Sequence, residues 1–110
     1  MFTLTIMADW NFKNEDGIDT EFENIQLLFL SGKVKHMYEL LERSPTKIAS
    51  LLGLNYNSYH DKLRNPEKFT SLHINTIAYA IRINPDIIHN VIQKEILEQV
   101  IQKFEKYKSK

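Results

Sequence analysis

The chain has 110 residues, of which 43% are hydrophobic, and its 14 basic and 14 acidic residues cancel to a net charge of zero. This length and composition predict one small domain with a single core and exclude a low-complexity or disordered chain. The absence of cysteine excludes disulfides, thiolate metal sites and cysteine nucleophiles, so a cytoplasmic location is expected.

Residues 1–20 are predicted to be an N-terminal extension of a helical domain that spans residues 21–110. Phe2, Leu4 and Ile6 alternate with threonines, which is the period of a half-buried strand. Such a strand would pair with its copy in a second subunit, pack irregularly, or be a frayed tail. Residues 9–23 carry six acids and one lysine, a net charge of −5, so a loop is expected around Gly17.

Two helices are predicted between this loop and residue 44. The apolar face of the first consists of Phe22, Ile25, Leu28 and Phe29. Ser31 and Gly32 are expected to end this helix. The apolar stripe of the second helix consists of Val34, Met37, Tyr38 and Leu41.

The segment from Pro45 to Pro66 is typical of two short helices joined by a tight turn. Ser44 can cap the first helix, which would begin at Pro45. Gly53 can adopt the left-handed conformation that ends a helix. The apolar face of the first helix would comprise Ile48, Leu51 and Leu52, with Ala49 small enough for a second helix to approach, and Leu54 would point into the core from the turn.

The second helix of this segment is predicted from Tyr56 to Arg64, with Asn55 as its cap and Asn65 and Pro66 as its end. Tyr59 and Leu63 would anchor it in the core. The polar residues left facing outward are Asn57, Ser58, Asp61, Lys62 and Arg64. Amide and cationic side chains of this kind can reach base edges and phosphates.

Two further helices are predicted after this segment. Thr70 or Ser71 caps the first, whose apolar stripe is Leu72, Ile74, Ile77, Ala78 and Ile81. Asn84 and Pro85 make the break before the last helix, which is expected from Asp86 almost to Lys106.

The C-terminal half of the last helix carries more apolar residues than one compact core can cover. We expect Ile96, Leu97, Val100, Ile101 and Phe104 to form the interface of a homodimer. In the alternative, the helix bends and folds back on Phe22, Leu28 and Phe29.

Residues 33–92 resemble the lambda-repressor/Cro-like helix-turn-helix family. The residues similar to that family's fixed small and apolar positions are Ala49, Gly53, Leu54 and Tyr59, with Ile48 and Leu52. The resemblance implies an all-α bundle of about five helices that binds DNA and regulates transcription in bacteria or their phages. Where the family has an apolar residue three positions after Tyr59, this chain has Lys62, and the anchor falls on Leu63 instead. That change could rotate the recognition helix by about 100°.

On this interpretation, a dimer presents two recognition helices to successive major grooves about 34 Å apart and acts as a repressor-type regulator. Asn57, Ser58, Asp61 and Lys62 would read base edges. Thr46, Lys47, Asn55, Arg64 and Lys68 would contact phosphates. Residues 33–74 carry seven cations and four acids, a net charge of +3 that coincides with the motif.

Other functions receive less support from the sequence. The histidines, His36, His60, His73 and His89, are scattered, and no nucleophile motif or phosphate-binding loop is found. We therefore expect no enzyme activity, cofactor, metal or small-molecule effector. No secretory signal or membrane-spanning run is recognised, so no membrane partner is expected. The alternative to DNA binding is a protein-interaction module, antitoxin-like or an adaptor, that uses the last helix.

Overall fold

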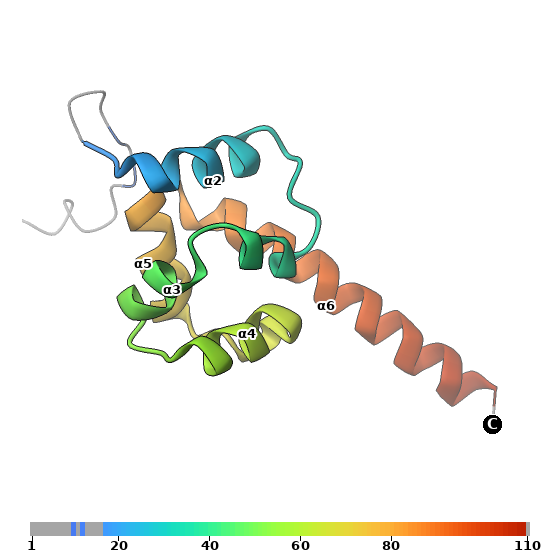
Figure 1. The fold of residues 1–110 in the computed structure, drawn as a ribbon. Helices are drawn as coiled ribbons and strands as arrows, with labels where there is room; N and C mark the ends of the chain where they lie inside the picture. Colours follow the sequence, from blue (N-terminus) through green and yellow to red (C-terminus); the bar gives the residue numbers. More distant parts are fainter. Residues whose placement is uncertain (1–9, 11, 13–16, 110) are drawn as a thin grey trace, which may run out of the picture.

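The computed structural model describes residues 10, 12 and 17–109. In this part of the chain every regular element is helical: five α-helices, α2 to α6, and two 3₁₀ helices, η1 and η2 (Figure 1). The all-α class is therefore confirmed for the described residues. The strand predicted at residues 2–6 lies outside them.

Helix α2 (Thr20–Leu30) forms one side of the core, as its apolar period predicted. The carboxylate of Asp19 caps it by accepting a hydrogen bond of 3.0 Å from the backbone N–H of Glu21. The buried residues of the helix are Phe22, Ile25 and Phe29. After Ser31 the chain turns through Gly32, whose φ of +75° is left-handed, so the predicted end of the helix is confirmed.

The second predicted helix is instead a short 3₁₀ helix, η1 (Met37–Glu42). Its start is delayed because the carboxylate of Glu39 accepts the backbone N–H groups of Lys35 and His36, each at 3.0 Å, and holds them outside the helix. With three residues per turn, Met37 and Leu40 share the core side. Tyr38 is consequently exposed, so its place in the predicted stripe is wrong, whereas Val34 and Met37 are buried and Leu41 packs against the core.

Helices α3 (Pro45–Leu51) and α4 (Tyr56–Arg64) are joined by a four-residue turn, with the bounds of α4 as predicted. Gly53 has a φ of +71°, and the N–H of Leu54 donates to the carbonyl of Ala49 at 2.9 Å, which closes the end of α3. The side chain of Asn55 accepts the N–H of Ser58 at 2.7 Å and caps α4.

Ser44 occupies the N-cap position before Pro45, as predicted, but its φ of 47° is left-handed and its side chain makes no capping hydrogen bond among the described residues. Two leucines that were predicted to lie on buried faces are exposed. Leu51 is exposed because it ends α3, and Leu52 and Leu54 from the turn pack against the core in its place. Leu72 is 73% exposed because it precedes Ile74 by two residues, which turns it about 200° away from the buried face of its helix.

The remaining helices close the core. The short helix η2 (Pro66–Lys68), which the sequence did not predict, leads into α5 (Ser71–Ile81), which Thr70 caps by accepting the N–H of His73 at 3.1 Å. The buried face of α5 is Ile74, Ile77, Ala78 and Ile81. Helix α6 (Pro85–Lys108) follows, capped by Asn84, and extends two residues past its predicted end.

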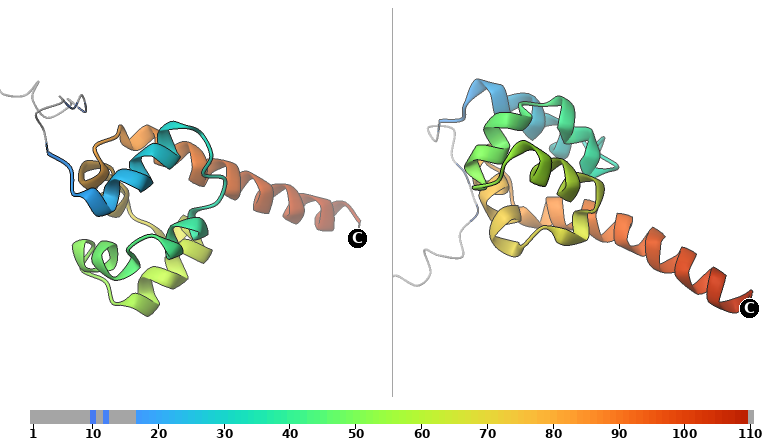
Figure 2. Two further views of the ribbon diagram at one scale, coloured as in Figure 1. Left: turned by 45° about the horizontal axis from the view of Figure 1, so that its top comes forward. Right: turned by 60° about the horizontal axis from the view of Figure 1, so that its bottom comes forward.

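Helix α6 has two halves with different surroundings. Its first half packs on the core through Ile88 and Ile92, with Ile96 partly buried against it. The second half projects from the bundle in every view (Figures 1 and 2), so the alternative in which the helix folds back on its own domain is wrong. Its exposed apolar residues are Leu97, Val100, Ile101 and Phe104, together with Tyr107, which the sequence analysis omitted.

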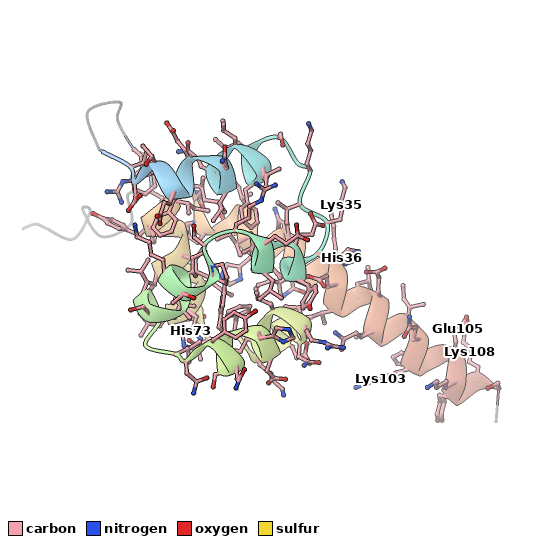
Figure 3. The ribbon with its side chains drawn as sticks, viewed as in Figure 1. Lys35, His36, His73, Lys103, Glu105 and Lys108 are labelled. Carbon is pink, nitrogen blue, oxygen red and sulfur yellow. The ribbon has the colours of Figure 1, made fainter. Side chains whose placement is uncertain are left out.

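The carboxylate of Glu95 ties η1 to α6 at the point where α6 leaves the core. It accepts the backbone N–H of Met37 at 2.8 Å and lies 3.4 Å from Nδ1 of His36, which is labelled in Figure 3. Among the described helices, α6 included, none combines the length and the apolar character needed to cross a membrane.

Candidate nucleic-acid interface

The rotation of α4 about its axis is set by two anchors, Tyr59 and Leu63, whose side chains are completely buried. With 100° between successive residues, the side opposite these anchors carries Asn57 and Asp61, both exposed. Lys62 lies on one flank and is half-buried. Lys62, three positions after Tyr59, thus lies at the edge of the buried face, and Leu63 completes the anchor.

Asp61, Lys62 and Lys68 form a linked group at the C-terminal end of α4. The carboxylate of Asp61 accepts hydrogen bonds from Lys68 Nζ at 3.0 Å and from the amide of Asn65 at 3.1 Å. Lys62 Nζ points toward the carbonyl of Lys68 at 3.4 Å. The ammonium group of Lys68 keeps the pKa of the Asp61 carboxyl below its ordinary value.

Lys47 is held by α2 rather than lying free on the surface. Its ammonium group contacts the carboxylates of Asp19 and, at 3.1 Å, Glu21, and it lies 5.4 Å from the centre of the Phe22 ring. The hydrogen bond with Asp19, followed by that with Glu21, raises the pKa of Lys47. A phosphate would therefore compete with two carboxylates for this lysine.

The other predicted phosphate-contacting residues are differently placed. Thr46 is exposed in the first turn of α3. Asn55 uses its side-chain oxygen to cap α4. Arg64 is exposed at the end of α4. Lys47 is instead paired with an acid at the start of α2. The predicted site residues that the structure places on α4 and η2 are Asn57, Ser58, Asp61, Lys62, Arg64 and Lys68.

Three aromatic residues that were not among the predicted site residues lie together, Tyr56 and His60 on α4 and Tyr38 on η1. The hydroxyl of Tyr38 lies 3.3 Å from Nε2 of His60, and the two rings meet edge to face with their centres 5.4 Å apart. The ring of Tyr56 is 6.1 Å from that of His60. The guanidinium of Arg64 lies 5.9 Å from the centre of the Tyr38 ring. The spacing of Tyr56, His60 and Arg64 by four residues was a detectable signal, but the approach of Tyr38 was not.

Metal binding would be a further property of the surface. Within residues 17–109 and the two described aromatic residues before them, no three histidine, aspartate or glutamate side chains are placed to hold a metal ion. Comparisons with protein-family models, curated proteins and solved structures find no match to this chain. The resemblance of residues 33–92 to the lambda-repressor/Cro-like family accordingly stays a prediction.

The anchor Tyr59 has a buried hydroxyl, and no group in the described part of the chain forms a hydrogen bond with it. A buried hydroxyl without a partner loses its hydration without compensation. We therefore expect Tyr59→Phe to raise the free energy of unfolding by about 1 kcal/mol, measured by urea denaturation at pH 7. Tyr79→Phe, at an exposed tyrosine, is the matched control and should change little.

The same substitution should alter stability at alkaline pH. Burial raises the pKa of Tyr59, whereas in the unfolded chain the phenol ionises near pH 10. Ionisation of Tyr59 therefore leaves stability unchanged below about pH 10 and lowers it by about 1.4 kcal/mol per pH unit above it. Tyr59→Phe should remove this loss. Equal alkaline sensitivity of the two proteins would show that this hydroxyl is hydrated.

Proposed function

We propose that this protein binds double-stranded DNA in a sequence-specific manner through α3, the turn and α4, and acts as a dimeric transcriptional regulator of the repressor type. The observation that carries the proposal is the orientation of α4. Its two anchors are buried and Asn57 and Asp61 on the opposite side are exposed. The helix lies at an edge of the bundle (Figures 1 and 2). A helix held in this way can enter the major groove. The proposal includes a lambda-repressor-like arrangement of α3 to α6.

The exposed residues of α4 suit base recognition. The amide of Asn57 can bind adenine through N6 and N7, and the hydroxyl of Ser58 can reach a neighbouring base. Asp61 and Lys68 are an exposed ion pair, and such pairs exchange partners readily. On DNA, Lys68 would move to a phosphate, and the released carboxylate of Asp61 would accept from the amino group of a cytosine. Lys62, on the flank of the helix, would remain free to reach a base or the adjacent backbone.

The charge of the protein favours selective binding. The net charge is zero, and Asp61 stands in the middle of the outer side of α4. Because non-specific binding depends on phosphate neutralisation, it should be weak for this protein. Affinity for DNA would then depend on the correct base contacts and on two half-sites being occupied together.

The projecting half of α6 provides a surface for dimerisation. Leu97, Val100, Phe104 and Tyr107 are exposed and follow the alternating spacing of three and four residues that is typical of a two-stranded coiled coil. Ile101 widens this stripe. Lys103 and Lys108 flank it on the part of α6 that lies beyond the bundle (Figure 3). Pairing of two such stripes about a two-fold axis would give a dimer suited to a near-palindromic site.

Replacing Asn57 with alanine tests the proposal. We expect the purified protein to select a two-fold symmetric motif from a pool of random duplexes. Asn57→Ala should lose discrimination at one base position in each half-site, by on the order of tenfold to a hundredfold, because a bidentate contact contributes about 1–3 kcal/mol. Asn90→Ala, an exposed asparagine on α6, is the matched control.

If Asn57→Ala enriches the same motif with the same base preference at every position, the role of α4 in base reading is contradicted. Failure of the wild-type protein to enrich any sequence at low salt would overturn DNA binding itself. In that event the exposed apolar stripe of α6 favours the second candidate function, a protein-interaction module that is antitoxin-like or an adaptor. For that function, Leu97→Glu should weaken binding of the protein partner and Asn57→Ala should not.

A further inference from the structure

Four side chains that are not among the proposed base-reading residues lie along one flank of α4. Tyr56, His60 and Arg64 follow one another at intervals of four residues, and Tyr38 of η1 leans on the last two. Tyr38 and Tyr56 remain 42% and 45% exposed, and Arg64 is exposed as well. We call these four residues the aromatic row. Large aromatic rings held at a surface with their polar ends in solvent are suited to binding.

The aromatic row is rich in hydrogen-bond donors. Each tyrosine has a hydroxyl, Arg64 has a guanidinium group, and the Tyr38–His60 pair can direct a proton outward, since each partner can act as donor or acceptor to the other. The nearby acid, Glu95, shares a surface pocket with Tyr38 and Arg64 but is bound to the N–H of Met37 and to His36. Neutral and cationic donors gathered in this way are complementary to an anion.

The position of the row on α4 suggests which anion it meets. Around the helix, the row lies about 180° from the flank formed by Ser58 and Lys62, and the outer residues Asn57 and Asp61 lie between the two flanks. A helix is about 10–12 Å wide and the major groove is about 12 Å wide. When the outer residues face the bases, the two flanks therefore face opposite strands.

We propose that the aromatic row is a phosphate-binding surface that grips one strand of the duplex while Lys62 and Lys68 contact the other. The inference rests on the proposed DNA binding and adds to it the residues Tyr38, Tyr56 and His60. The hydroxyls of Tyr38 and Tyr56 and the guanidinium of Arg64 would donate to phosphate oxygens. His60 would act as a positioning residue by holding the hydroxyl of Tyr38.

Tyr38→Phe and Tyr56→Phe test this surface because they remove the hydroxyls and keep the rings. Binding is measured by fluorescence anisotropy on the selected duplex and on an unrelated duplex. We expect each variant to lose about fivefold to tenfold in affinity on both duplexes, because phosphate contacts carry no sequence information. Tyr79→Phe, an exposed tyrosine on α5, should bind as the wild type does.

Arg64→Gln supplies a second measurement. The slope of the logarithm of affinity against that of salt concentration should fall by about one for this variant, and Arg43→Gln, an exposed arginine after η1, should leave it unchanged. Duplexes with a single neutral methylphosphonate locate the contact. The methylphosphonate at the contacted position should weaken DNA binding by the wild-type protein and should not weaken binding by Tyr38→Phe any further.

Three results would overturn the inference. If the tyrosine variants bind like Tyr79→Phe while Asn57→Ala loses base preference, the row is no DNA contact although the proposed function stands. A loss restricted to one base position would make the row a base-reading surface instead. If the wild-type protein binds no duplex at low salt, the inference and the proposed function fail together.

Discussion

Replacing Leu97 and Phe104 together with glutamate is expected to convert a dimer into a monomer and to lower affinity for a two-fold symmetric duplex by about a hundredfold or more. Both side chains are exposed, at 55% and 60%, and lie one heptad apart on the projecting half of α6. Carboxylates in the centre of a paired apolar stripe would be buried without partners, so the two copies should separate. Two free monomers would then lose the effective concentration that links binding at the two half-sites, which is worth about 10²–10⁴ in affinity.

The control for this experiment adds the same charge to the opposite side of α6. Gln102 and Ser109 are exposed and lie about 140–160° around the helix from the middle of the stripe, so Gln102→Glu with Ser109→Glu should leave the dimer and its affinity unchanged. Sedimentation equilibrium measures the association state, and fluorescence anisotropy measures binding to the selected duplex. A wild-type protein that is monomeric at micromolar concentration would contradict the assignment of this stripe, as would a glutamate variant that remains dimeric.

The sequence predicted those elements in which local signals and tertiary packing agree. The bounds of α4 could be predicted because Asn55 caps its start and Asn65 and Pro66 end it, and Tyr59 and Leu63 show the period of its buried face. Likewise, the apolar residues of the second half of α6 exceed what one core can cover. The exposure of these residues could be predicted from that excess, but the identity of the surface that covers them could not.

The residues that could not be predicted depend on contacts between distant parts of the chain. Lys47 was expected to be free for a phosphate, yet it pairs with Asp19, 28 residues earlier in the sequence. Tyr38 approaches His60, which lies 22 residues later in the sequence, and Glu39 of the same helix accepts two backbone N–H groups. A hydrophobic pattern contains neither fact. The pairing of Lys47 and the existence of the aromatic row could therefore be recognised only in the folded structure.

The two halves of α6 should respond very differently to the same substitution. Ile88 is completely buried in the first half, and Ile101 is 51% exposed in the second. Ile88→Ala removes three buried carbons and leaves a cavity, which costs about 3 kcal/mol. Because small domains are stable by only about 5–15 kcal/mol, Tm should fall by on the order of 15 °C. Ile101→Ala should change stability by less than about 0.5 kcal/mol when measured in the monomeric Leu97→Glu, Phe104→Glu background.

Urea denaturation followed by circular dichroism measures both variants, and the dimeric protein supplies the decisive comparison. In the dimer, Ile101→Ala should lower stability by an amount that grows with protein concentration until both proteins are fully dimeric, because the substitution weakens association and not the fold of each subunit. The effect of Ile88→Ala should be present in monomer and dimer alike. Similar losses for the two variants in the monomeric background would mean that the second half of α6 packs on its own domain, and the dimer surface would have to be sought elsewhere.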